Sequence, residues 1–269
     1  MPELPEVETT RAGIAPFLEQ TTIERVRVHN AKLRWPVSDE LAQLNGAMVR
    51  SILRRGKYII LGFDNGAILI HLGMSGSLRL VEPSYERKKH DHVEFVLSNG
   101  KLLRFNDPRR FGCILWTEDW PSHPLIRHLG PEPLQDQFDA AYLYRLSRGK
   151  KTSIKQFIMN SEIVVGVGNI YANESLFLSG ISPKRQAGRI SKVTMERLVD
   201  NIRTVLGKAI QQGGTTLRDF VNSDGSPGYF QQQLFVYGRG GEACKKCGSV
   251  LKEIRQNNRA SVYCPQCQR

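Results

Sequence analysis

The chain has 269 residues, enough for two domains that each bury a core. Its 38 Lys and Arg against 26 Asp and Glu give a formal charge of +12, so we expect a polyanionic partner: nucleic acid first, with a membrane surface as the rival. No apolar run approaches about 18 residues and no amino-terminal signal pattern is present, so we expect no membrane association and a cytoplasmic location.

The first eight residues, MPELPEVE, allow two interpretations. Removal of Met1 would leave Pro2 as a secondary amine, and a terminal amine with a pKa of about 8 is neutral far more often than a lysine with a pKa of about 10.4. Such an amine can attack a sugar aldehyde carbon to form an iminium ion, while Glu3 and Glu6 move protons. Alternatively, proline and acidic residues simply favour the first turn of a helix. These residues alone favour the helix start.

A helix and then a series of strands are expected in the first half of the chain. Apolar residues recur at helical spacing over residues 7–18, although Pro16 leaves the end of this helix open. Short β-branched runs follow, separated by hairpin turns such as Asp-Asn-Gly at 64–66. The expected strands are residues 23–28, 49–53, 58–63, 67–72, 92–97, 102–105 and 113–117. They predict an antiparallel sandwich or barrel, with Cys113 as a small core residue.

The second half of the chain is expected to be mainly helical. The segment LGPEPL at 129–134 ends the strand-rich region and indicates a domain boundary. Helices are expected over residues 140–148, 153–159, 170–178 and 191–212. The glycine-rich segment 213–230 then predicts a mobile loop of a length that more often serves a function than not.

Four cysteines near the end of the chain predict a metal site. Cys244, Cys247, Cys264 and Cys267 form two CxxC pairs with sixteen residues between them, a spacing typical of a structural four-thiolate zinc site. The intervening residues have room for a β-hairpin with its tip near 256–259. Two disulfides, the alternative, do not suit a reducing compartment.

Three other motifs are ambiguous when taken singly. In GVGN, glycines and Asn169 precede a helix, where backbone N–H groups bind phosphate and Asn169 would cap the helix. Lys57 opens a strand and would ordinarily be a solvated lysine. Met74, Arg109 and Phe111 lie in the turns HLGMSG and DPRRFG, and would suit insertion into a base stack, although core packing is an alternative for each.

Together these segments resemble one family, the bacterial formamidopyrimidine-DNA glycosylases, which are bifunctional base-excision repair enzymes. The motifs that carry the resemblance are MPELPEVE, RRGKY at 54–58, HLGMSGSL at 71–78, KHDHVEF at 89–95, NDPRRFG at 106–112, GVGNIYANE at 166–174, GGTTLRDF at 213–220 and the two CxxC pairs. They follow one another in family order along nearly the whole chain.

The resemblance implies a set of catalytic residues. Pro2 matches the nucleophile that displaces the damaged base at C1′, Glu3 the general acid and Glu6 a supporting carboxylate. Lys57 matches the proton donor of β-elimination and Arg259 that of δ-elimination. Because a guanidinium with a pKa above about 12 is a poor acid, we hypothesise that Arg259 mainly clamps the phosphate beside the lesion.

The resemblance also implies a DNA interface. His90, Arg109, Lys150 and Asn169 match DNA-contacting positions, and Met74, Arg109 and Phe111 match a void-filling triad with Arg109 opposite an estranged cytosine. The loop at 213–230 resembles the lid over a flipped 8-oxoguanine. The implied partner is damaged double-stranded DNA in the bacterial nucleoid, bound by a monomer with one structural zinc ion and no organic cofactor.

The implied fold class is α+β, with four parts. Residues 1–130 would form an N-terminal helix plus an antiparallel β-sandwich, and 131–150 a linker and first helix. Residues 151–230 would form a helix-two-turn-helix DNA-binding domain with the lesion-recognition loop, and 235–269 a zinc-finger hairpin.

Two other functions stay open at this point. A non-catalytic protein that grips damaged DNA would need neither Pro2, Glu3 nor Lys57. The sister family of oxidised-pyrimidine glycosylases has the same amine and zinc finger, but has Gly where Leu4 stands and lacks the Met-Arg-Phe triad.

Overall fold

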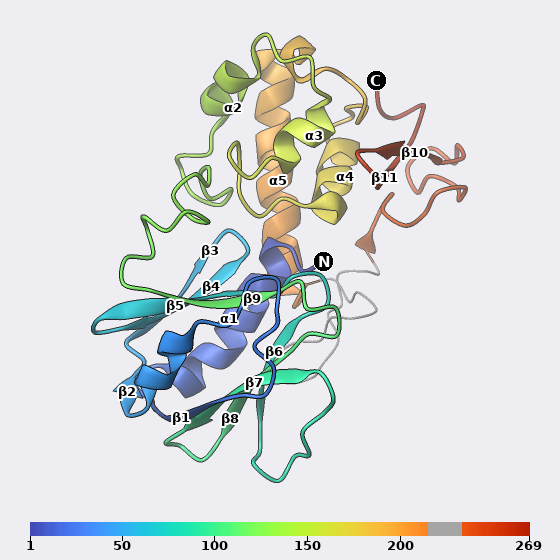
Figure 1. The fold of residues 1–269 in the computed structure, drawn as a ribbon. Coiled ribbons are helices and arrows are strands. Elements are labelled where there is room, and N and C mark those ends of the chain that lie inside the picture. Colours follow the sequence, from blue (N-terminus) through green and yellow to red (C-terminus); the bar gives the residue numbers. More distant parts are fainter. Residues whose placement is uncertain (215–232) are drawn as a thin grey trace. The chain divides into compact units, whose positions relative to one another are not determined.

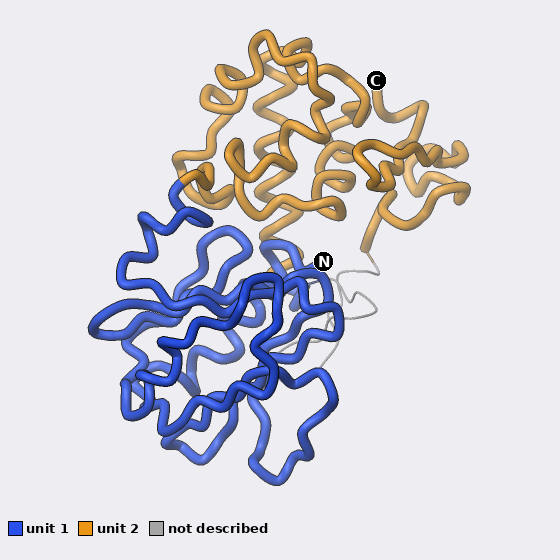
Figure 2. Tube along the Cα trace, viewed as in Figure 1, with its two compact units in different colours: residues 1–127, 212–229 blue, residues 128–211, 230–269 orange. Residues whose placement is uncertain are grey.

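The computed structural model describes residues 1–214 and 233–269, so most of the predicted loop at 213–230 lies outside the described residues. The chain divides into two compact units. Unit 1 comprises Met1–Arg127 with Gln212–Tyr229, and unit 2 comprises His128–Gln211 with Phe230–Arg269 (Figure 2). Each unit is described by itself.

Unit 1 is a helix with two antiparallel sheets (Figure 1). The helix α1 (Leu4–Leu18) is followed by β1 (Thr22–Val28), a 3-10 turn (Asp39–Leu44), β2 (Ala47–Met48), β3 (Ser51–Arg55), β4 (Tyr58–Phe63), β5 (Gly66–His71), β6 (Ser77–Val81), β7 (Asp91–Leu97), β8 (Leu102–Asn106) and β9 (Cys113–Thr117). One sheet has the order β2-β1-β7-β8-β6 and the other β3-β4-β5-β9. The predicted antiparallel sandwich is confirmed.

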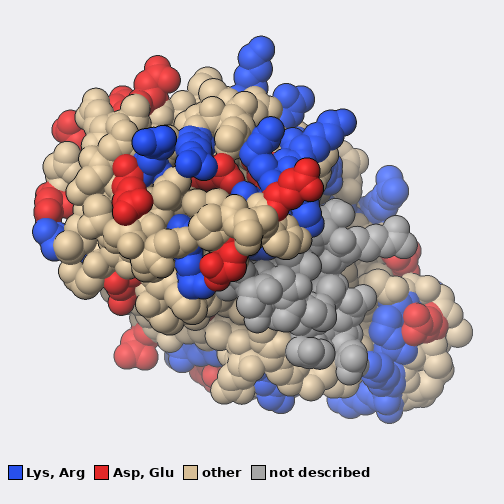
Figure 3. All heavy atoms as spheres, turned by 90° about the horizontal axis from the view of Figure 1, so that it is seen from below, with Lys and Arg blue, Asp and Glu red and all other residues tan. Residues whose placement is uncertain are grey.

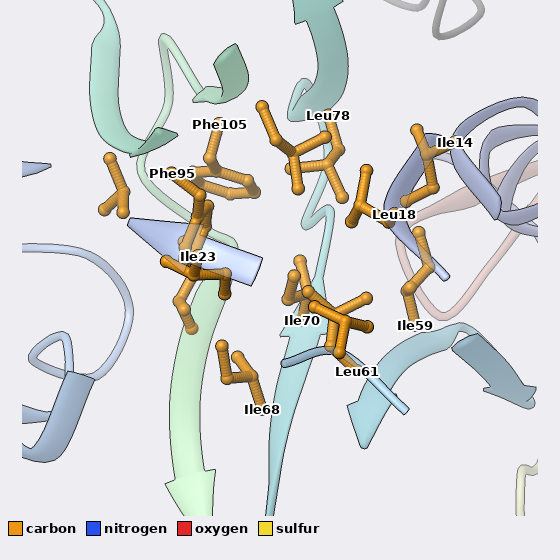
Figure 4. Packing of buried hydrophobic residues seen from close by; sticks show 14 of the residues in the cluster. Ile14, Leu18, Ile23, Ile59, Leu61, Ile68, Ile70, Leu78, Phe95 and Phe105 are labelled. Atoms are coloured by element: carbon orange, nitrogen blue, oxygen red, sulfur yellow. The ribbon is translucent and has the colours of Figure 1, made fainter. Parts of the chain in front are cut away.

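The core of unit 1 lies where α1 meets the inner faces of both sheets. The helix packs against β3 and β4 of one sheet and β6 of the other. Figure 4 shows Leu18 of α1, Leu61 and Ile70 of one sheet, and Leu78 and Phe105 of the other turned toward one another. Each such buried side chain stabilises the fold by about 1.5–3 kcal/mol. This core holds the helix start and the strand ends, where the predicted site residues lie.

The element boundaries differ from the sequence prediction in informative places. The helix α1 begins at Leu4 and continues through Pro16 to Leu18. The strand β6 was not predicted, although Leu78 and Leu80 alternate with polar neighbours, because the glycines before it indicated a turn. Cys113 is fully buried, which confirms it as a core residue.

Unit 2 consists of helices and a hairpin. Its elements are α2 (Ala140–Ser147), α3 (Ile154–Met159), α4 (Asn169–Leu178), a 3-10 turn (Ala187–Arg189), α5 (Lys192–Gln211), β10 (Lys252–Gln256) and β11 (Arg259–Tyr263). The long helix α5 packs against α2 and α4, and α4 also contacts α3 and β11. The α+β fold class with a helical domain and a terminal hairpin is confirmed. None of the described helices has the length and apolar character needed to cross a membrane.

Candidate active site and nucleic-acid interface

Two buried acidic residues that follow Pro2 in the sequence, Glu3 and Glu6, form the start of α1. Glu3 is the residue that caps α1, and its backbone N–H donates to Oε2 of Glu6 at 2.8 Å. Pro2 is buried, Glu3 is 2% exposed and Glu6 is fully buried. The helix-start interpretation is therefore confirmed without excluding the catalytic one, since the acidic residues that begin the helix also follow Pro2 closely in the sequence.

The backbone of Gly214 lies against the side chain of Glu6. It follows α5, belongs to unit 1 and has a positive φ of +79°. A Cβ atom added there would lie 3.1 Å from Oε1 of Glu6 and 3.2 Å from its Cγ. The second glycine of the GGTTLRDF motif thus has its backbone against Glu6, and a side chain at this position would press on the carboxylate.

Lys57 occupies a tight turn that is fastened to α1. Gly56, with φ +58°, and Lys57 join β3 to β4, where Arg55 pairs with Tyr58. Arg54 donates to the Gly56 carbonyl at 3.0 Å and to Oε2 of Glu8, on α1, at 2.8 Å. Burial disfavours the charged Glu8 carboxylate, but hydrogen bonds from Arg11 and Arg54 outweigh burial and lower its pKa. The turn with Lys57 and the helix that follows Pro2 are therefore held in one arrangement.

A neutral histidine, His71, lies near this turn. Its ring packs against Tyr58 with the centroids 4.8 Å apart. Burial, and then the positive charges of Lys57 and Arg34, lower its pKa to about 4. Its Nδ1 accepts a hydrogen bond from the Gly73 N–H at 3.0 Å, so the proton of the neutral ring lies on Nε2. No role was predicted for His71 from the sequence, although a histidine that ends an apolar strand just before a glycine turn was an available signal.

Met74, Arg109 and Phe111 are exposed on two turns that touch each other. Met74 is 39% exposed and Phe111 44% exposed, and the Arg109 guanidinium lies 5.0 Å from the centroid of the Phe111 ring. At Gly73, an added Cβ atom would lie 2.5 Å from the Phe111 carbonyl carbon. The core-packing alternative is thus wrong for Met74 and Phe111, and the two turns present all three side chains to solvent.

His90 lies at the same edge of unit 1. Its carbonyl accepts a hydrogen bond from the Asp107 N–H at 3.0 Å, and its partly exposed ring lies 6.3 Å from that of His92. This backbone bond joins the segment that ends in His90 to the turn that carries Arg109 and Phe111. The face drawn in Figure 3 carries several groups of Lys and Arg side chains, with Asp and Glu side chains among them.

In unit 2, Lys150 and Asn169 lie at turns next to helices. Lys150 is exposed, and its carbonyl accepts a hydrogen bond from the Gly188 N–H at 3.0 Å. Gly168 is the N-cap of α4 and Asn169 is its first residue, so the expectation that Asn169 caps the helix is wrong. The Oδ1 atom of Asn169 is buried and has no hydrogen-bond partner among the described residues.

The four terminal cysteines fit a zinc ion. Their Sγ atoms all lie within 4.8 Å of one another, and those of Cys247 and Cys264 are 3.4 Å apart. Zn–S bonds of about 2.3 Å in a tetrahedron place sulfurs about 3.8 Å apart, so only a small adjustment is needed. The N–H of Lys246 points to the Cys244 sulfur and that of Cys267 to the Cys264 sulfur, each at 3.4 Å. Four thiolates complete the coordination sphere, so the zinc is structural.

Buried polar side chains attach the zinc hairpin to the helices. Lys155, on α3, is 1% exposed and donates to the Ala260 carbonyl at 2.8 Å and to the Ser261 hydroxyl at 2.6 Å. Asn173, on α4, accepts from the Val262 N–H at 2.9 Å. These bonds reach β11, whose first residue is the exposed Arg259. The helices thereby fix the position of the strand that carries the Arg259 side chain.

Glu174 fixes the segment that enters the zinc finger. Its carboxylate accepts hydrogen bonds from the N–H groups of Phe235, Val236 and Tyr237 at 2.8–2.9 Å. Burial raises its pKa, and the three N–H groups partly offset this effect. No role was predicted from the sequence for Lys155, Asn173 and Glu174, although Asn173 and Glu174 lie inside the GVGNIYANE motif. Polar residues within an apolar helix were the available signal.

The predicted site residues divide between the two units. Unit 1 brings together the residues near the amino terminus and the exposed turns, namely Pro2, Glu3, Glu6, Lys57, Met74, His90, Arg109 and Phe111. Unit 2 contains Lys150, Asn169, Arg259 and the four cysteines.

Three family models match successive parts of the chain. They are described as the formamidopyrimidine-DNA glycosylase N-terminal domain, at residues 1–114, the formamidopyrimidine-DNA glycosylase H2TH domain, at 129–221, and the zinc finger found in FPG and IleRS, at 241–269. A formamidopyrimidine-DNA glycosylase of Marinobacter nauticus is 60% identical over 270 residues and one of Pseudomonas aeruginosa is 57% identical, each match covering 100% of both chains.

Solved structures agree with these matches. Lactococcus lactis Fpg in complex with DNA containing an abasic site has a TM-score of 0.92 at 32% identity, with 99% of both chains covered. The MutM (Fpg) protein of Thermus thermophilus has a TM-score of 0.89 at 35% identity, with 99% of this chain and 98% of that chain covered. With full-length relatives at this identity and three matching models in order, the chain belongs to the formamidopyrimidine-DNA glycosylase family.

Proposed function

We propose that the chain removes oxidised purines, 8-oxoguanine and formamidopyrimidines, from duplex DNA through the amine of Pro2, and then cuts the strand by β,δ-elimination. As a member of its family the chain is a bifunctional DNA glycosylase and lyase of base-excision repair. The observation that carries the residue assignment is the pair of buried acidic side chains, Glu3 and Glu6, directly after Pro2. Lactococcus lactis Fpg, 32% identical, has been solved with DNA that contains an abasic site.

The first step requires a free amine. While Met1 is attached, the Pro2 nitrogen is an amide and has no available lone pair. After Met1 is removed, the nitrogen attacks C1′, the glycosidic bond breaks with its electron pair on the base, and Glu3 gives the leaving base a proton. Ring opening, with a proton delivered to O4′ and the amine proton lost, leaves an iminium ion between Pro2 and C1′. Glu6, held by the Glu3 N–H, positions the groups that move these protons.

Strand cleavage follows from the electron demand of the iminium ion. Loss of a C2′ proton allows the 3′ C–O bond to break with its electron pair on the phosphate, and a second elimination releases the 5′ phosphate. Lys57 supplies the proton transfer of the first elimination from its turn beside α1. Arg259 holds the phosphate next to the lesion, because a guanidinium is a poor proton donor but a good two-pronged phosphate ligand.

The exposed turns of unit 1 make a lesion inside the duplex accessible to the active site. Met74 and Phe111 occupy the space of the extruded base and Arg109 binds its former partner, which offsets the few kcal/mol that base extrusion costs. His90, Lys150 and Asn169 contact the DNA backbone. We propose one monomer per lesion, because a single lesion has no two-fold symmetry, and a location in the cytoplasm at the nucleoid, because that is where chromosomal DNA lies.

Borohydride trapping tests the proposal. Protein shown by intact mass to lack Met1 is incubated with a duplex containing 8-oxoguanine opposite cytosine and then reduced. We expect one covalent adduct at Pro2, and Glu3→Gln should lose base excision but still form the adduct with a preformed abasic site. Absence of an adduct with the wild-type chain would overturn the assignment, and faster excision of thymine glycol than of 8-oxoguanine would favour the pyrimidine-specific sister activity.

The role of Arg259 has its own test. Arg259→Lys keeps a positive charge and a better proton donor but loses the planar fork of the guanidinium. A clamp predicts slower strand cleavage with one zinc per chain retained. Wild-type cleavage by this variant would instead support a proton-donor role.

A further inference from the structure

A single buried carboxylate, that of Asp107, joins the turns that carry the exposed triad. Asp107 is fully buried. Its Oδ1 accepts from the Ser75 hydroxyl at 2.8 Å and from the Arg109 N–H at 3.2 Å, and its Oδ2 accepts from the Gly112 N–H at 2.8 Å. Each bond reaches a member of the triad or the residue next to one: Ser75 follows Met74, and Gly112 follows Phe111.

The backbone of Asp107 extends the same connection to a third segment. Its N–H donates to the His90 carbonyl at 3.0 Å, and its carbonyl lies 2.8 Å from Nε2 of His92. Asp107 therefore contacts all three segments of unit 1 that present predicted DNA-contacting side chains.

The chemistry of these contacts indicates that geometry, rather than stability, is what the carboxylate provides. Its side-chain donors are neutral, a hydroxyl and two backbone N–H groups. A carboxylate taken out of water carries a desolvation penalty of several kcal/mol, which neutral donors only partly offset. An acceptor with two oxygens at fixed separation is what allows one side chain to hold both turns at once.

The two turns around Asp107 are in close backbone contact. A Cβ atom added at Gly112 would lie 2.6 Å from the His71 carbonyl oxygen and 3.2 Å from Oδ2 of Asp107. The turns meet backbone to backbone at Gly73 and Gly112, so their relative position is set by the bonds to Asp107. The exposed side chains are thus carried by two turns that a buried carboxylate holds together.

We propose that Asp107 is a positioning residue that aligns Met74, Arg109 and Phe111 for insertion into the duplex, and thereby sets the preference for the base opposite the lesion. This inference rests on the proposed function. Asp107 touches neither the lesion nor the reacting atoms, and it acts through the backbone of the turns. Its effect is confined to duplex DNA, because a single strand has neither a partner base nor a stack to fill.

Asp107→Asn is the main test, because it keeps the shape of the side chain and replaces one acceptor oxygen with a donor facing a backbone N–H. We expect 8-oxoguanine excision opposite cytosine to fall about tenfold or more, in line with the loss of one hydrogen bond to a charged group. The ratio of excision opposite cytosine to excision opposite adenine should fall toward one. Cleavage of a single-stranded abasic oligonucleotide should stay within about twofold of wild type. Ser75→Ala removes the hydroxyl that donates to Asp107 and that shares the Arg109 N–H with it, at 3.2 Å, and leaves the carboxylate in place. It should show a smaller change in the same direction.

Two further measurements keep the proposal open to failure. In a double-mutant cycle, Asp107→Asn should change the opposite-base preference little once Arg109 is replaced by alanine. Both substitutions act on the same contact, that of Arg109 with the base opposite the lesion. Unaltered opposite-base preference in a folded Asp107→Asn variant, or equal loss of single-strand cleavage, would overturn the proposal. If that variant does not fold, Ser75→Ala decides by the same criteria.

The outcomes also separate this proposal from the proposed function. Binding of a duplex with a tetrahydrofuran site opposite cytosine or adenine needs no catalysis. A wild-type chain that forms no covalent adduct would contradict the proposed function, whereas equal opposite-base preference in binding by wild type and Asp107→Asn would contradict the positioning role alone.

Discussion

The two units hold their exposed functional side chains on different supports. In unit 1, Met74, Arg109 and Phe111 stand on turns at the ends of strands in a sandwich with a continuous apolar core. In unit 2, Arg259 lies on a two-stranded hairpin. Among the described residues, the buried part of its apolar cluster consists of Phe177, Val236, Leu251, Val262 and two of the cysteines. A hairpin of this size is marginal in water by itself. A metal and buried hydrogen bonds from the helices replace the missing core.

The largest effect expected from this difference is loss of the metal. Structural zinc binding contributes on the order of 10 kcal/mol, so Cys244→Ser should unfold the hairpin and abolish strand cleavage and tight DNA binding. Cys113→Ala is the matched control, because Cys113 is a buried core residue outside the cysteine cluster. It should keep one zinc per chain by elemental analysis. Wild-type strand cleavage by a zinc-free Cys244→Ser variant would show that the metal is not the support.

The next effect concerns Gly214, whose backbone lies against Glu6. Gly214→Ala should lower base excision about tenfold, because the added Cβ atom meets the Glu6 side chain and a positive φ costs a non-glycine residue about 1 kcal/mol. Gly207→Ala, within α5, is the matched control, since an added Cβ atom there meets nothing within 4 Å. That variant should gain up to about 1 kcal/mol of stability with unchanged activity. Single-turnover excision measures the activity of each variant, and urea unfolding measures its stability. Equal activity of the two alanine variants would contradict the role of Gly214.

A smaller effect is expected where the helices attach to the hairpin. Lys155→Met removes the donor to the Ala260 carbonyl and the Ser261 hydroxyl, which costs about 1–3 kcal/mol per unsatisfied group. We expect weaker duplex binding and faster hydrogen exchange of the β11 amides, with zinc retained. Lys192→Met, at the exposed start of α5, is the control for loss of a lysine charge. Slow exchange of β11 amides in Lys155→Met would show that the metal suffices.

The contrast between the units also explains what could be predicted from sequence. The strands from Tyr58 to Phe63 and from Cys113 to Thr117 were predicted to the residue, because β-branched and aromatic runs and the turn residues around them are local signals. The zinc site followed from the spacing of four cysteines. Asp107 and Lys155 were not found, because their partners Ser75 and Ser261 lie 32 and 106 residues away. No local pattern indicates which distant backbone groups a buried polar side chain will meet.

The smallest effect expected is a pH dependence from unit 1. His71 has a pKa lowered to about 4 in the folded chain, mainly by burial, whereas an unfolded histidine has a pKa of about 6.5. The unfolded state therefore binds an extra proton between these values, and the free energy of unfolding should fall as the pH falls. This term is about 1 kcal/mol between pH 6.5 and pH 5.5. Urea unfolding of wild type and His71→Gln across this range isolates it, because other titrating groups cancel in the difference. We expect the variant to have the flatter profile. Parallel profiles would mean that His71 has the same pKa in the folded and the unfolded chain, and so is not kept neutral by burial.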